Sequence, residues 1–293
     1  MTAISAIILT KDEEGRIARC IESVSDCVSE VFIVDSGSTD STVKIARDLG
    51  ARVVEHPFRG YALQRNWAQS NLPISTPWVL HVDADEALDS VLRLWLRTQF
   101  DRISQDAVGV LIRRRIVFLG KEIRHGGVHP TFHCRLFRME AGFCERRMYD
   151  QHFVVTGPLV RAKGFLVEDN GSDVVAWCAK HLRWASLEAA ELTIGQSVGS
   201  DRETLPGVQP RLFGSPIERR RWLRTVVYAK SPPLLRPWLL FLYRVVLRLG
   251  FLDGWRGMVY HFLQGLWFRT LVDVLLLARR DISNRPREKR TSG

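Results

Sequence analysis

The sequence predicts an α/β protein with a mostly parallel, Rossmann-like sheet flanked by helices. Short apolar runs of strand length recur along the first 90 residues, at 3–9, 31–34, 52–55 and 78–82. Between the first two runs, apolar residues recur at helical spacing from Ile17 to Val28 and predict an amphipathic helix that covers the sheet. Apolar strands joined by helices are typical of parallel sheets, whose ligands bind at the carboxyl ends of the strands.

The 293 residues are enough for one large α/β domain and an appended region. The balance of 46% hydrophobic and 25% charged residues excludes a disordered or low-complexity protein. Five cysteines without a CxxC pair argue against a disulfide scaffold or a zinc knuckle and favour a reducing compartment. The apolar run 4–9 lacks a preceding basic region, so we interpret it as a strand and not as a secretory signal.

Positive charge is concentrated in the last quarter of the chain. Residues 211–293 contain 17 Lys and Arg against 5 Asp and Glu, a net charge of +12, whereas residues 1–210 carry −2. Such a segment attracts nucleic acid or an anionic membrane surface. Its arginines alternate with tryptophans and aliphatic runs, which favours the membrane surface and argues against nucleic acid. We expect a catalytic domain at 1–205 and a basic, aromatic-rich helical membrane-associating region at 206–293.

The sequence offers two modes of membrane contact, a spanning helix and a helix that lies in the interface. No window of 18 residues is free of charge, and the best spanning candidate, 258–278, contains Arg269, whose insertion costs about 2.5 to 3.5 kcal/mol. Arg244 and Arg248 share one face of a predicted amphipathic helix at 237–249, which indicates a helix lying in the interface. A core-packed helical subdomain or a dimer surface is the alternative.

Acidic and hydroxyl side chains follow three of the predicted strands, in the segments 10–13, 35–40 and 83–86. Taken alone, 35–40 fits a glycine turn and a helix N-cap equally well. Asp83, Asp85 and Glu86 repel one another unless a cation or ligand neutralises them, so this segment predicts a site for Mg²⁺ or Mn²⁺. The motifs GxGxxG, GxxxxGK[ST] and GxSxG are absent, which removes the usual support for a dinucleotide fold, a P-loop enzyme or an α/β-hydrolase.

Four motifs in order resemble family 2 glycosyltransferases of the GT-A fold, and most closely the branch of lipopolysaccharide core β-1,4-glucosyltransferases. They are Ile8 to Glu13, Ile33 to Thr42, Gln64 to Ala68 and His81 to Glu86, with weaker similarity at 118–121, 135–138, 180–181 and 250–254. The resemblance implies inverting, metal-dependent transfer of a sugar from a nucleoside-diphosphate donor.

The resemblance also implies roles for individual residues on the donor side. Thr10 and Asp35 would lie along the nucleoside, Arg65 would reach the base or diphosphate, and Asp83 with Asp85 would hold ribose and metal. The family commonly has two aspartates where this chain has Asp35 and Ser36. This departure leaves the base open, and we favour a UDP-sugar.

An inverting transfer also needs a base for the acceptor hydroxyl. Asp150 is the first candidate, because its place in Met148 to Phe153 resembles that of the branch's catalytic carboxylate; an ion pair with Arg146 or Arg147 is the alternative. Asp169 is the second candidate, with a helix cap as its alternative. His152 would orient the acid or the acceptor, or be structural.

Further cationic residues are candidates for the diphosphate or acceptor. Lys180 and His181 lie on a predicted helix with Trp177 and Trp184, a cluster that suits a diphosphate or a sugar ring, although a solvated helix face over core tryptophans fits as well. Arg124, in a loop with two glycines, is a candidate for the acceptor side.

From the sequence we therefore expect a glycosyltransferase that acts on a lipid-linked glycan acceptor in cell-envelope polysaccharide or lipopolysaccharide biosynthesis. Its expected location is cytoplasmic, peripheral on the inner face of the plasma membrane. Two other classes stay open: a nucleotide-sugar-binding protein without turnover, and a nucleic-acid-binding protein that uses the basic C-terminal region.

Overall fold

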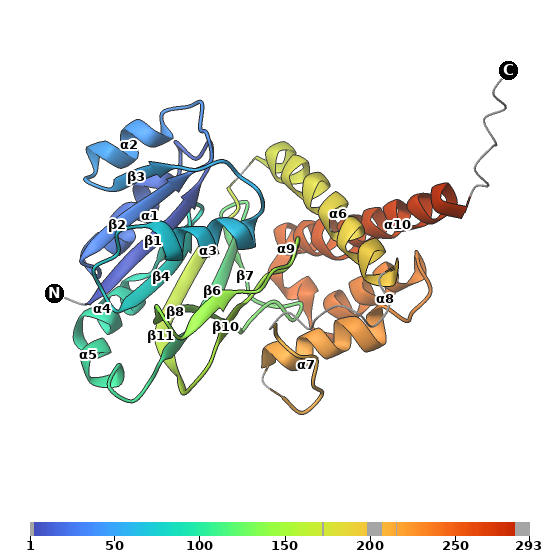
Figure 1. Cartoon of the computed structure of the whole chain (residues 1–293). Helices are drawn as coiled ribbons and strands as arrows, with labels where there is room; N and C mark the ends of the chain where they lie inside the picture. The colour runs from blue at the N-terminus through green and yellow to red at the C-terminus, as the bar shows by residue number, and fades with distance from the viewer. Residues whose placement is uncertain (1–2, 172, 198–206, 215, 285–293) are drawn as a thin grey trace, which may run out of the picture.

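The protein is built on one large mixed sheet with helices on both faces (Figure 1). This computed structural model describes residues 3–171, 173–197, 207–214 and 216–284. Within these residues the sheet has nine strands in the order β3-β2-β1-β4-β8-β6-β11-β5, with β7 paired to β6, and β9 and β10 form a separate antiparallel pair.

The first half follows the predicted alternation of strands and helices. The strands β1 to β4 pair in parallel, β3 with β2, β2 with β1 and β1 with β4, so their carboxyl ends meet at one edge. Each predicted apolar run forms a strand, the predicted helix between the first two runs forms α1, and two more helices join the remaining strands: β1 (Ile4–Thr10), α1 (Ile17–Ser25), β2 (Glu30–Asp35), α2 (Thr42–Asp48), β3 (Arg52–Glu55), α3 (Tyr61–Asn71) and β4 (Trp78–Asp83).

The second half of the sheet is not purely parallel. The prediction of a mostly parallel sheet holds for β1 to β4, whereas β8 runs antiparallel to β4 and β6, and β5 runs antiparallel to β11. The elements are β5 (Glu86–Leu88), α4 (Ser90–Thr98), α5 (Phe100–Ile103), β6 (Gly109–Phe118), β7 (Lys121–Ile123), β8 (Thr131–Arg138), β9 (Gly142–Cys144), β10 (Phe153–Val155) and β11 (Leu159–Asp169). Antiparallel neighbours such as β6 and β8 need no helical crossover, so from β6 to β11 the chain lacks the strand–helix alternation that signalled the first half.

Two apolar layers sandwich the sheet. On one face, β1 and β4 pack against α1 and α4 through side chains such as Ile8, Cys20 and Leu96. On the other face, Ile7 and Phe32 pack against α3 and the β9–β10 pair. Burial on both faces explains why these strands are apolar throughout.

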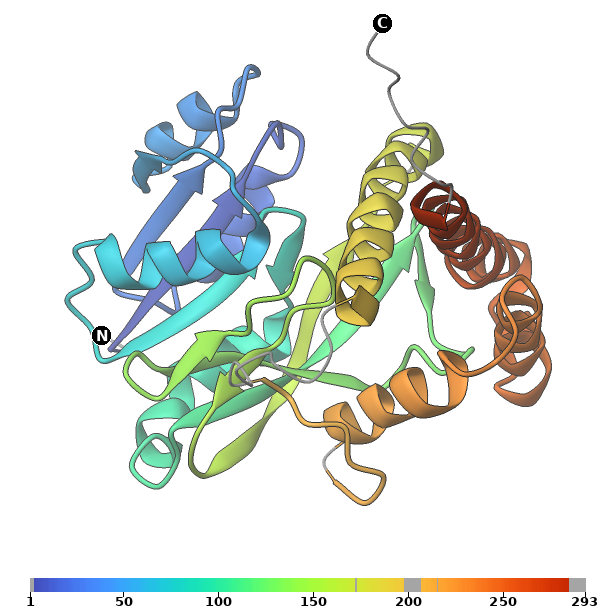
Figure 2. The same cartoon turned by 45° about the vertical axis from the view of Figure 1, so that its right-hand side comes forward.

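The C-terminal helices pack beside the sheet against the long helix α6 (Val174–Ser197), as Figure 2 shows. Ala185 and Ala189 of α6 contact Phe268 and Val272 in one buried cluster. Tyr260 packs on Phe118 of β6 with ring centroids 5.5 Å apart. The elements are α7 (Pro216–Trp222), η1 (Leu223–Tyr228), α8 (Leu235–Leu242), η2 (Tyr243–Leu247), η3 (Gly250–Asp253), α9 (Gly254–His261), η4 (Phe262–Trp267) and α10 (Phe268–Asn284).

The segment Gly250–Arg280 is long and apolar enough to cross a membrane by length and composition, and 39% of its most apolar window is buried inside the protein. Its two central charges are paired: Arg269 lies 2.8 Å from Glu188, and Asp273 accepts from Arg236 at 2.9 Å. Buried ion pairs of this kind fix the segment against α6 and α8.

Candidate active site

Three strand ends bring the predicted donor residues together. Thr10 pairs with Asp35 across β1 and β2, and Leu9 pairs with Asp83 across β1 and β4. Thr10 is buried, and its hydroxyl is among the buried polar atoms without a hydrogen-bond partner. A buried hydroxyl without a partner at the carboxyl edge of a parallel sheet is available to a ligand.

Asp35 organises the loop that follows β2. Its carboxylate accepts hydrogen bonds from the backbone N–H groups of Gly37 and Ser38 at 2.9 Å and from the Ser38 hydroxyl at 2.5 Å. The Ser36 hydroxyl accepts from Gln64 at 3.3 Å. The segment 35–40 thus forms a turn that the Asp35 side chain holds at the carboxyl end of β2.

Asp83 is held by two arginines. Arg65 of α3 donates to both carboxylate oxygens at 2.8 and 2.9 Å, and Arg135 of β8 donates to one of them at 3.0 Å. Burial alone would raise the pKa of Asp83, but the charges of Arg65 and Arg135 hold it well below its usual range. Asp83 is therefore ionised at neutral pH.

Glu86 shares Arg135 with Asp83, but its pKa is raised and not lowered. Arg135 donates to Glu86 at 3.1 Å, and Glu86 accepts from the backbone N–H of Asp83 at 2.9 Å. Burial raises the pKa of Glu86 to about 8; Asp83 and Asp85 add to the rise, and Arg135 opposes it. One guanidinium cannot balance both carboxylates, so Glu86 is largely protonated at neutral pH.

Asp85 forms an ion pair with a lysine of the helix α6. Lys180 of α6 donates to Asp85 at 2.8 Å, and its pKa is raised because the Asp85 charge outweighs the effect of burial. One helical turn further along α6, the Trp184 ring N–H lies 3.4 Å from the Tyr61 hydroxyl. The helix α6 therefore covers the carboxyl ends of β1 and β4.

The residues present fit a divalent ion that is held jointly with a diphosphate. The described part of the chain contains no group of three or more His, Cys, Asp or Glu that could hold a metal by itself. Asp85 and Asp83 supply hard carboxylate oxygens at one strand end, and Mg²⁺ is commonly bound by one or two carboxylates plus substrate phosphates.

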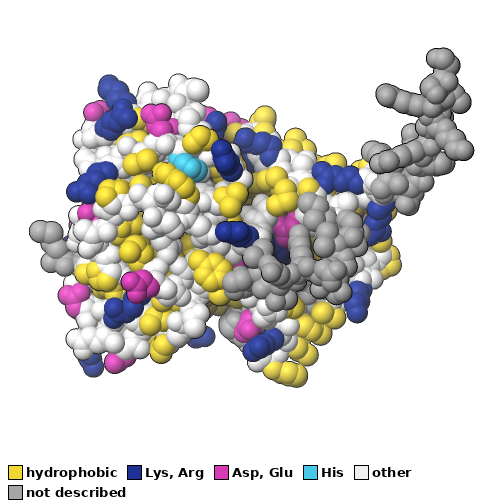
Figure 3. Space-filling view, in the orientation of Figure 1, with side chains coloured by type: hydrophobic (Ala, Val, Ile, Leu, Met, Phe, Trp, Pro, Cys, Tyr) yellow, Lys and Arg dark blue, Asp and Glu magenta, His cyan; other side chains and the backbone are white. Residues whose placement is uncertain are grey.

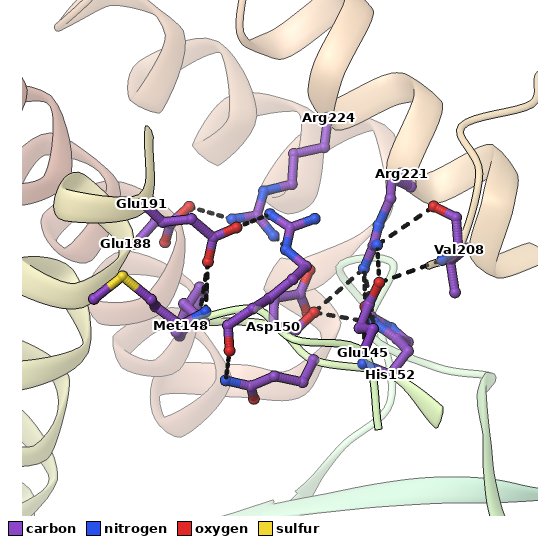
Figure 4. Close-up of polar contacts among 12 residues, drawn as sticks. Glu145, Met148, Asp150, His152, Glu188, Glu191, Val208, Arg221 and Arg224 are labelled. Carbon is purple, nitrogen blue, oxygen red and sulfur yellow. Dashed lines mark hydrogen bonds and ion pairs between the residues drawn. The ribbon is translucent and has the colours of Figure 1, made fainter. Parts of the chain in front are cut away.

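The base candidate Asp150 lies in the loop between β9 and β10, and its partner comes from the C-terminal helices. Arg224 of η1 donates to the Asp150 carboxylate and also to Glu188 of α6 (Figure 4). The expected alternative partner, Arg147, instead pairs with Glu191 at 2.6 Å. Burial works against ionisation, but Arg224 keeps the pKa of Asp150 below its usual value.

Glu145 and His152 also hold the loop of Asp150 in place, by hydrogen bonds between its two ends. Arg221 of α7 donates to both Glu145 oxygens at 2.6 Å. His152 donates its backbone N–H to Glu145 at 2.9 Å, and its ring Nδ1 lies 3.3 Å from the same carboxylate. Burial raises the pKa of Glu145, but His152 and Arg221 together lower it to about 2. His152 thus supports the Asp150 loop through Glu145.

The loop is joined to the donor residues through Phe153. The Arg65 guanidinium lies 5.7 Å from the centroid of the Phe153 ring, and that ring packs on His81 at 4.5 Å. Because Arg65 also binds Asp83, the base candidate and the Asp83 site are connected through two side chains.

The second base candidate, Asp169, lies at the end of the strand β11. Asp169 ends β11 beside Asp85, where its backbone N–H donates to the Asp85 carbonyl at 3.1 Å and its carboxylate pairs with Arg19. Asp173, rather than Asp169, accepts from an N–H in the first turn of α6. Asp169 thus lies beside Asp85, at the carboxyl end of β11.

The other two candidates for the diphosphate or acceptor are His181, which is buried, and Arg124, which is exposed. His181 is 4% exposed and stacks on Trp177 at 3.3 Å between α6 and α10, where burial lowers its pKa to about 4. Arg124 is 67% exposed and pairs with Glu122 at 2.9 Å. His181, the residue after Lys180 in α6, thus contacts Trp177 and Phe268, and Arg124 pairs with a neighbouring residue at the surface.

Sequence reasoning missed Arg135, Glu145, Arg221 and Arg224 as site residues. Arg135 is a charged residue in the middle of the mostly apolar strand β8, which was an available signal, and Glu145 directly follows the strand β9. Arg221 and Arg224 stand in a basic helix whose charges looked alike in the sequence, so only their partners distinguish them.

This geometry agrees with the comparison to known families. Residues 5–157, more than half of the chain, match the family described as Glycosyl transferase family 2. The chain belongs to glycosyl transferase family 2. The match includes the strand ends with Thr10, Asp35, Asp83 and Asp85, and it ends shortly after the Asp150 loop.

Individual relatives are similar over part of their length. A lipopolysaccharide core biosynthesis glycosyltransferase, LpsC of Rhizobium meliloti, is 37% identical over 144 residues, which are 47% of this chain and 52% of LpsC. An uncharacterized glycosyltransferase of Rickettsia felis is 47% identical over 106 residues, 36% of this chain and 37% of the relative. The chain thus spans between about a third and a half of these curated relatives.

A solved structure shares the whole fold. The mannosyltransferase PcManGT from Pyrobaculum calidifontis, in complex with GDP-Man and Mn²⁺, has a TM-score of 0.51, with 15% identity, over 97% of this chain and 88% of that one. At this identity the likeness concerns the fold, which is the GT-A fold expected from the sequence.

Proposed function

We propose that this protein is an inverting glycosyltransferase that moves a sugar from a nucleoside-diphosphate donor to a lipid-linked glycan acceptor in cell-envelope polysaccharide or lipopolysaccharide biosynthesis. The observation that carries the proposal is the convergence of Asp83 and Asp85 with Arg65 and Lys180 at the carboxyl edge of the sheet. Family membership and the similarity to LpsC support the reaction class and the pathway class.

The donor would lie along the strand ends of β1, β2 and β4. Thr10, Asp35 and Ser36 border the nucleoside, and Arg65 and Lys180 supply positive charge for the diphosphate. Asp85, with Asp83, would hold Mg²⁺ or Mn²⁺, which neutralises the departing diphosphate when bound. PcManGT, described with GDP-Man and Mn²⁺, supports a nucleotide-sugar and metal requirement; a UDP-sugar is the first donor to test and a GDP-sugar the second.

Asp150 is the proposed base. One of its oxygens accepts from Arg224, and the other can take the proton of the acceptor hydroxyl. Because its pKa is depressed, Asp150 is ionised and ready at neutral pH, while Arg224 fixes its orientation. Asp169 remains the second candidate, since it lies beside Asp85.

The C-terminal region, with its boundary proposed at 206, would hold the protein on an anionic membrane surface at the cytoplasmic side. Figure 3 shows hydrophobic side chains gathered at the lower right edge, over the α7–α8 segment. Leu247 is 73% exposed and Trp255 66%, and Leu239, Leu242 and Leu252 are about half exposed. Arg248 is exposed among them, whereas Arg244 is turned inward and donates to Gln264 at 2.8 Å.

The proposal is tested by a thermal-shift screen of UDP- and GDP-sugars with and without Mn²⁺, followed by a donor hydrolysis assay. A ligand at about 100 times its dissociation constant stabilises the native state by about 2.7 kcal/mol, which is readily measured. Stabilisation that needs both nucleotide and metal is the expected result. Binding without any hydrolysis or transfer would indicate a nucleotide-sugar-binding protein instead.

Membrane contact has its own test. Leu247→Glu with Leu252→Glu should release the protein from vesicles that contain anionic lipid, while donor binding is retained. These variants are preferable to truncation, because removing the C-terminal helices would leave buried Glu145 without Arg221. Retention on vesicles by the double variant would show that the contact lies elsewhere.

A further inference from the structure

Polar side chains of β6 and β8 face the C-terminal helices. Arg114 of β6 is paired with Thr131 of β8, and His133 follows Thr131 at the second position, so the three side chains lie on one face of the sheet. The side chain of Arg114 is 31% exposed, although β6 lies inside the sheet between β8 and β11. Solvent therefore reaches this face. The charge of Arg114 is balanced by Glu168 of β11, at 3.1 Å.

Three arginines from different elements converge on Tyr260 of α9, a helix that lies against β6 and β7 (Figure 1). They are Arg114, Arg220 of α7 and Arg244 of η2. Burial raises the pKa of the Tyr260 hydroxyl, and all three arginines oppose the rise, which shows that their charges lie near it. Tyr260 is 5% exposed, and its hydroxyl is not hydrogen-bonded to any described residue. This hydroxyl is available to a ligand.

The charges of Arg220 and Arg244 are not balanced by a carboxylate of the described residues. Arg220 is exposed as a residue, but its guanidinium donates to the hydroxyl of buried Thr131 at 3.0 Å. Arg244 donates to the amide oxygen of Gln264 at 2.8 Å. Both partners are neutral. Desolvation lowers the pKa of each arginine, and neighbouring arginines add to the effect. Two positive charges thus remain next to Tyr260, and an anion is the ligand that complements them.

This arginine cluster adjoins the loop of the proposed base. The rings of His133 and His152 are stacked, with centroids 5.6 Å apart and 7° between their planes. Desolvation and Arg114 lower the pKa of Arg220, but the Asp150 carboxylate is near enough to oppose them. A sugar whose hydroxyl reaches Asp150 would therefore have its neighbouring substituents beside the arginines.

We propose that the arginine cluster binds a phosphate group of the acceptor, so that the acceptor is a phosphorylated glycan. Arg220, Arg244 and the Tyr260 hydroxyl would donate to the phosphate oxygens. A phosphate monoester carries nearly two negative charges at neutral pH, which matches two unbalanced guanidinium groups, whereas a carboxylate would leave one of them unmatched. This inference rests on the proposed function and specifies the chemical class of its acceptor.

Isothermal titration of the full-length protein tests the site. UDP and Mg²⁺ are added first at saturation to occupy the donor site, and the probes are glucose 6-phosphate, mannose 6-phosphate, glucose and inorganic phosphate. We expect at least one sugar phosphate to bind about tenfold more tightly than glucose, because charge-assisted hydrogen bonds to phosphate are strong. It should also bind more tightly than inorganic phosphate, because the sugar adds contacts beside Asp150.

Two outcomes of this titration would overturn the proposal. Binding of UDP without binding of either sugar phosphate would reject the phosphate site and leave the proposed glycosyl transfer intact. Binding of inorganic phosphate as tight as that of the sugar phosphates would show a site for free anions and would reject the acceptor assignment. A protein that binds no nucleotide at all would contradict the proposed function itself, and the same probes without UDP would then test the arginine cluster alone.

Variants locate the binding. Arg220→Gln and Arg244→Gln should each weaken binding of the sugar phosphate about tenfold and leave UDP binding unchanged. Tyr260→Phe keeps the ring on Phe118 and removes only the hydroxyl, so it should weaken binding about threefold. Arg219→Gln removes the same charge from the neighbouring exposed position of α7 and should have no effect.

The comparison of Arg220 with Arg219 keeps the test independent of folding, because both are exposed residues of one helix. Arg220→Lys, which retains the charge, should recover part of the binding that Arg220→Gln loses. Equal weakening by Arg219→Gln and Arg220→Gln would show general attraction by a basic surface and would overturn the site. Full binding by the double variant Arg220→Gln with Arg244→Gln would overturn it as well.

Discussion

The donor side and the base side of the candidate active site hold their carboxylates with arginines from different parts of the chain. On the donor side, Asp83 is bound by Arg65 and Arg135, both from the sheet domain. On the base side, Glu145 and Asp150 are bound by arginines of the α7–η1 helix. The donor side is therefore complete without the C-terminal region, whereas the base side requires it.

Two equally buried glutamates show how the number of neighbouring arginines affects the pKa of a carboxylate. Glu86 and Glu145 are each 2% exposed. Burial and nearby aspartates raise the pKa of Glu86 to about 8, because its arginine is shared. Burial acts on Glu145 too, but His152 and a dedicated Arg221 lower its pKa to about 2. The number of cations per carboxylate, and not burial, decides the protonation state.

The comparison predicts that a donor-side change abolishes binding of donor and metal. Asp85→Asn should remove Mn²⁺-dependent nucleotide binding, because an amide keeps the contact with Lys180 but is a poor ligand for a hard cation. Isothermal titration with UDP and GDP in Mn²⁺ measures the loss. Asp48→Asn, an exposed aspartate of α2, is the control. Unchanged affinity in Asp85→Asn would reject the metal assignment.

A base-side change should spare donor binding and remove transfer. Asp150→Asn keeps the shape and the acceptor for Arg224 but cannot take a proton at neutral pH, so the transfer rate should fall by about 10² to 10⁴. Single-turnover kinetics with bound donor measure it. Asp169→Asn should retain most of the rate; if the two variants exchange their behaviour, Asp169 is the base.

The support that the C-terminal helices give to the base side can be tested by removing Arg221. Arg221→Met should lower the free energy of unfolding by about 3 to 5 kcal/mol, because it leaves Glu145 buried and unpaired. Arg221→Met with Glu145→Leu removes both charges and should recover most of that loss. Urea unfolding measures both variants. Equal instability of the single and double variants would show that packing, and not the unpaired charge, is responsible.

The two glutamates should give stability profiles of opposite sign. Glu86 has a folded pKa above its ordinary 4.5, so its contribution is full below pH 4.5 and is lost as the pH rises toward about 8. Glu145 has a folded pKa below 4.5, so its contribution is present above pH 4.5 and is lost as the pH falls toward about 2. Melting temperatures across pH should flatten on the alkaline side in Glu86→Gln and on the acid side in Glu145→Gln. If both variants changed the pH dependence of the melting temperature in the same way, the difference proposed between Glu86 and Glu145 would be wrong.

The sequence predicted a structural feature wherever the pattern that indicates it lies within one strand or one helix. The four parallel strands, their helices and the acidic strand ends with Asp35, Asp83 and Asp85 could all be predicted. Their signal is local, because a strand buried on both faces must be apolar and a residue that ends it must lie at the carboxyl edge. The family could be identified for the same reason.

Pairing between distant charges was decided only by the tertiary structure. Lys180 meets Asp85 across 95 residues, and Arg224 meets Asp150 across 74. A helix with several arginines presents the same pattern whichever carboxylate each one finds, so Arg221 and Arg224 could not be told from their neighbours. The partner also fixes the pKa, since Glu86 and Glu145 are alike in residue type and burial. The sequence by itself determined which residues could carry charge at the strand ends, and the fold decided which of those charges are balanced.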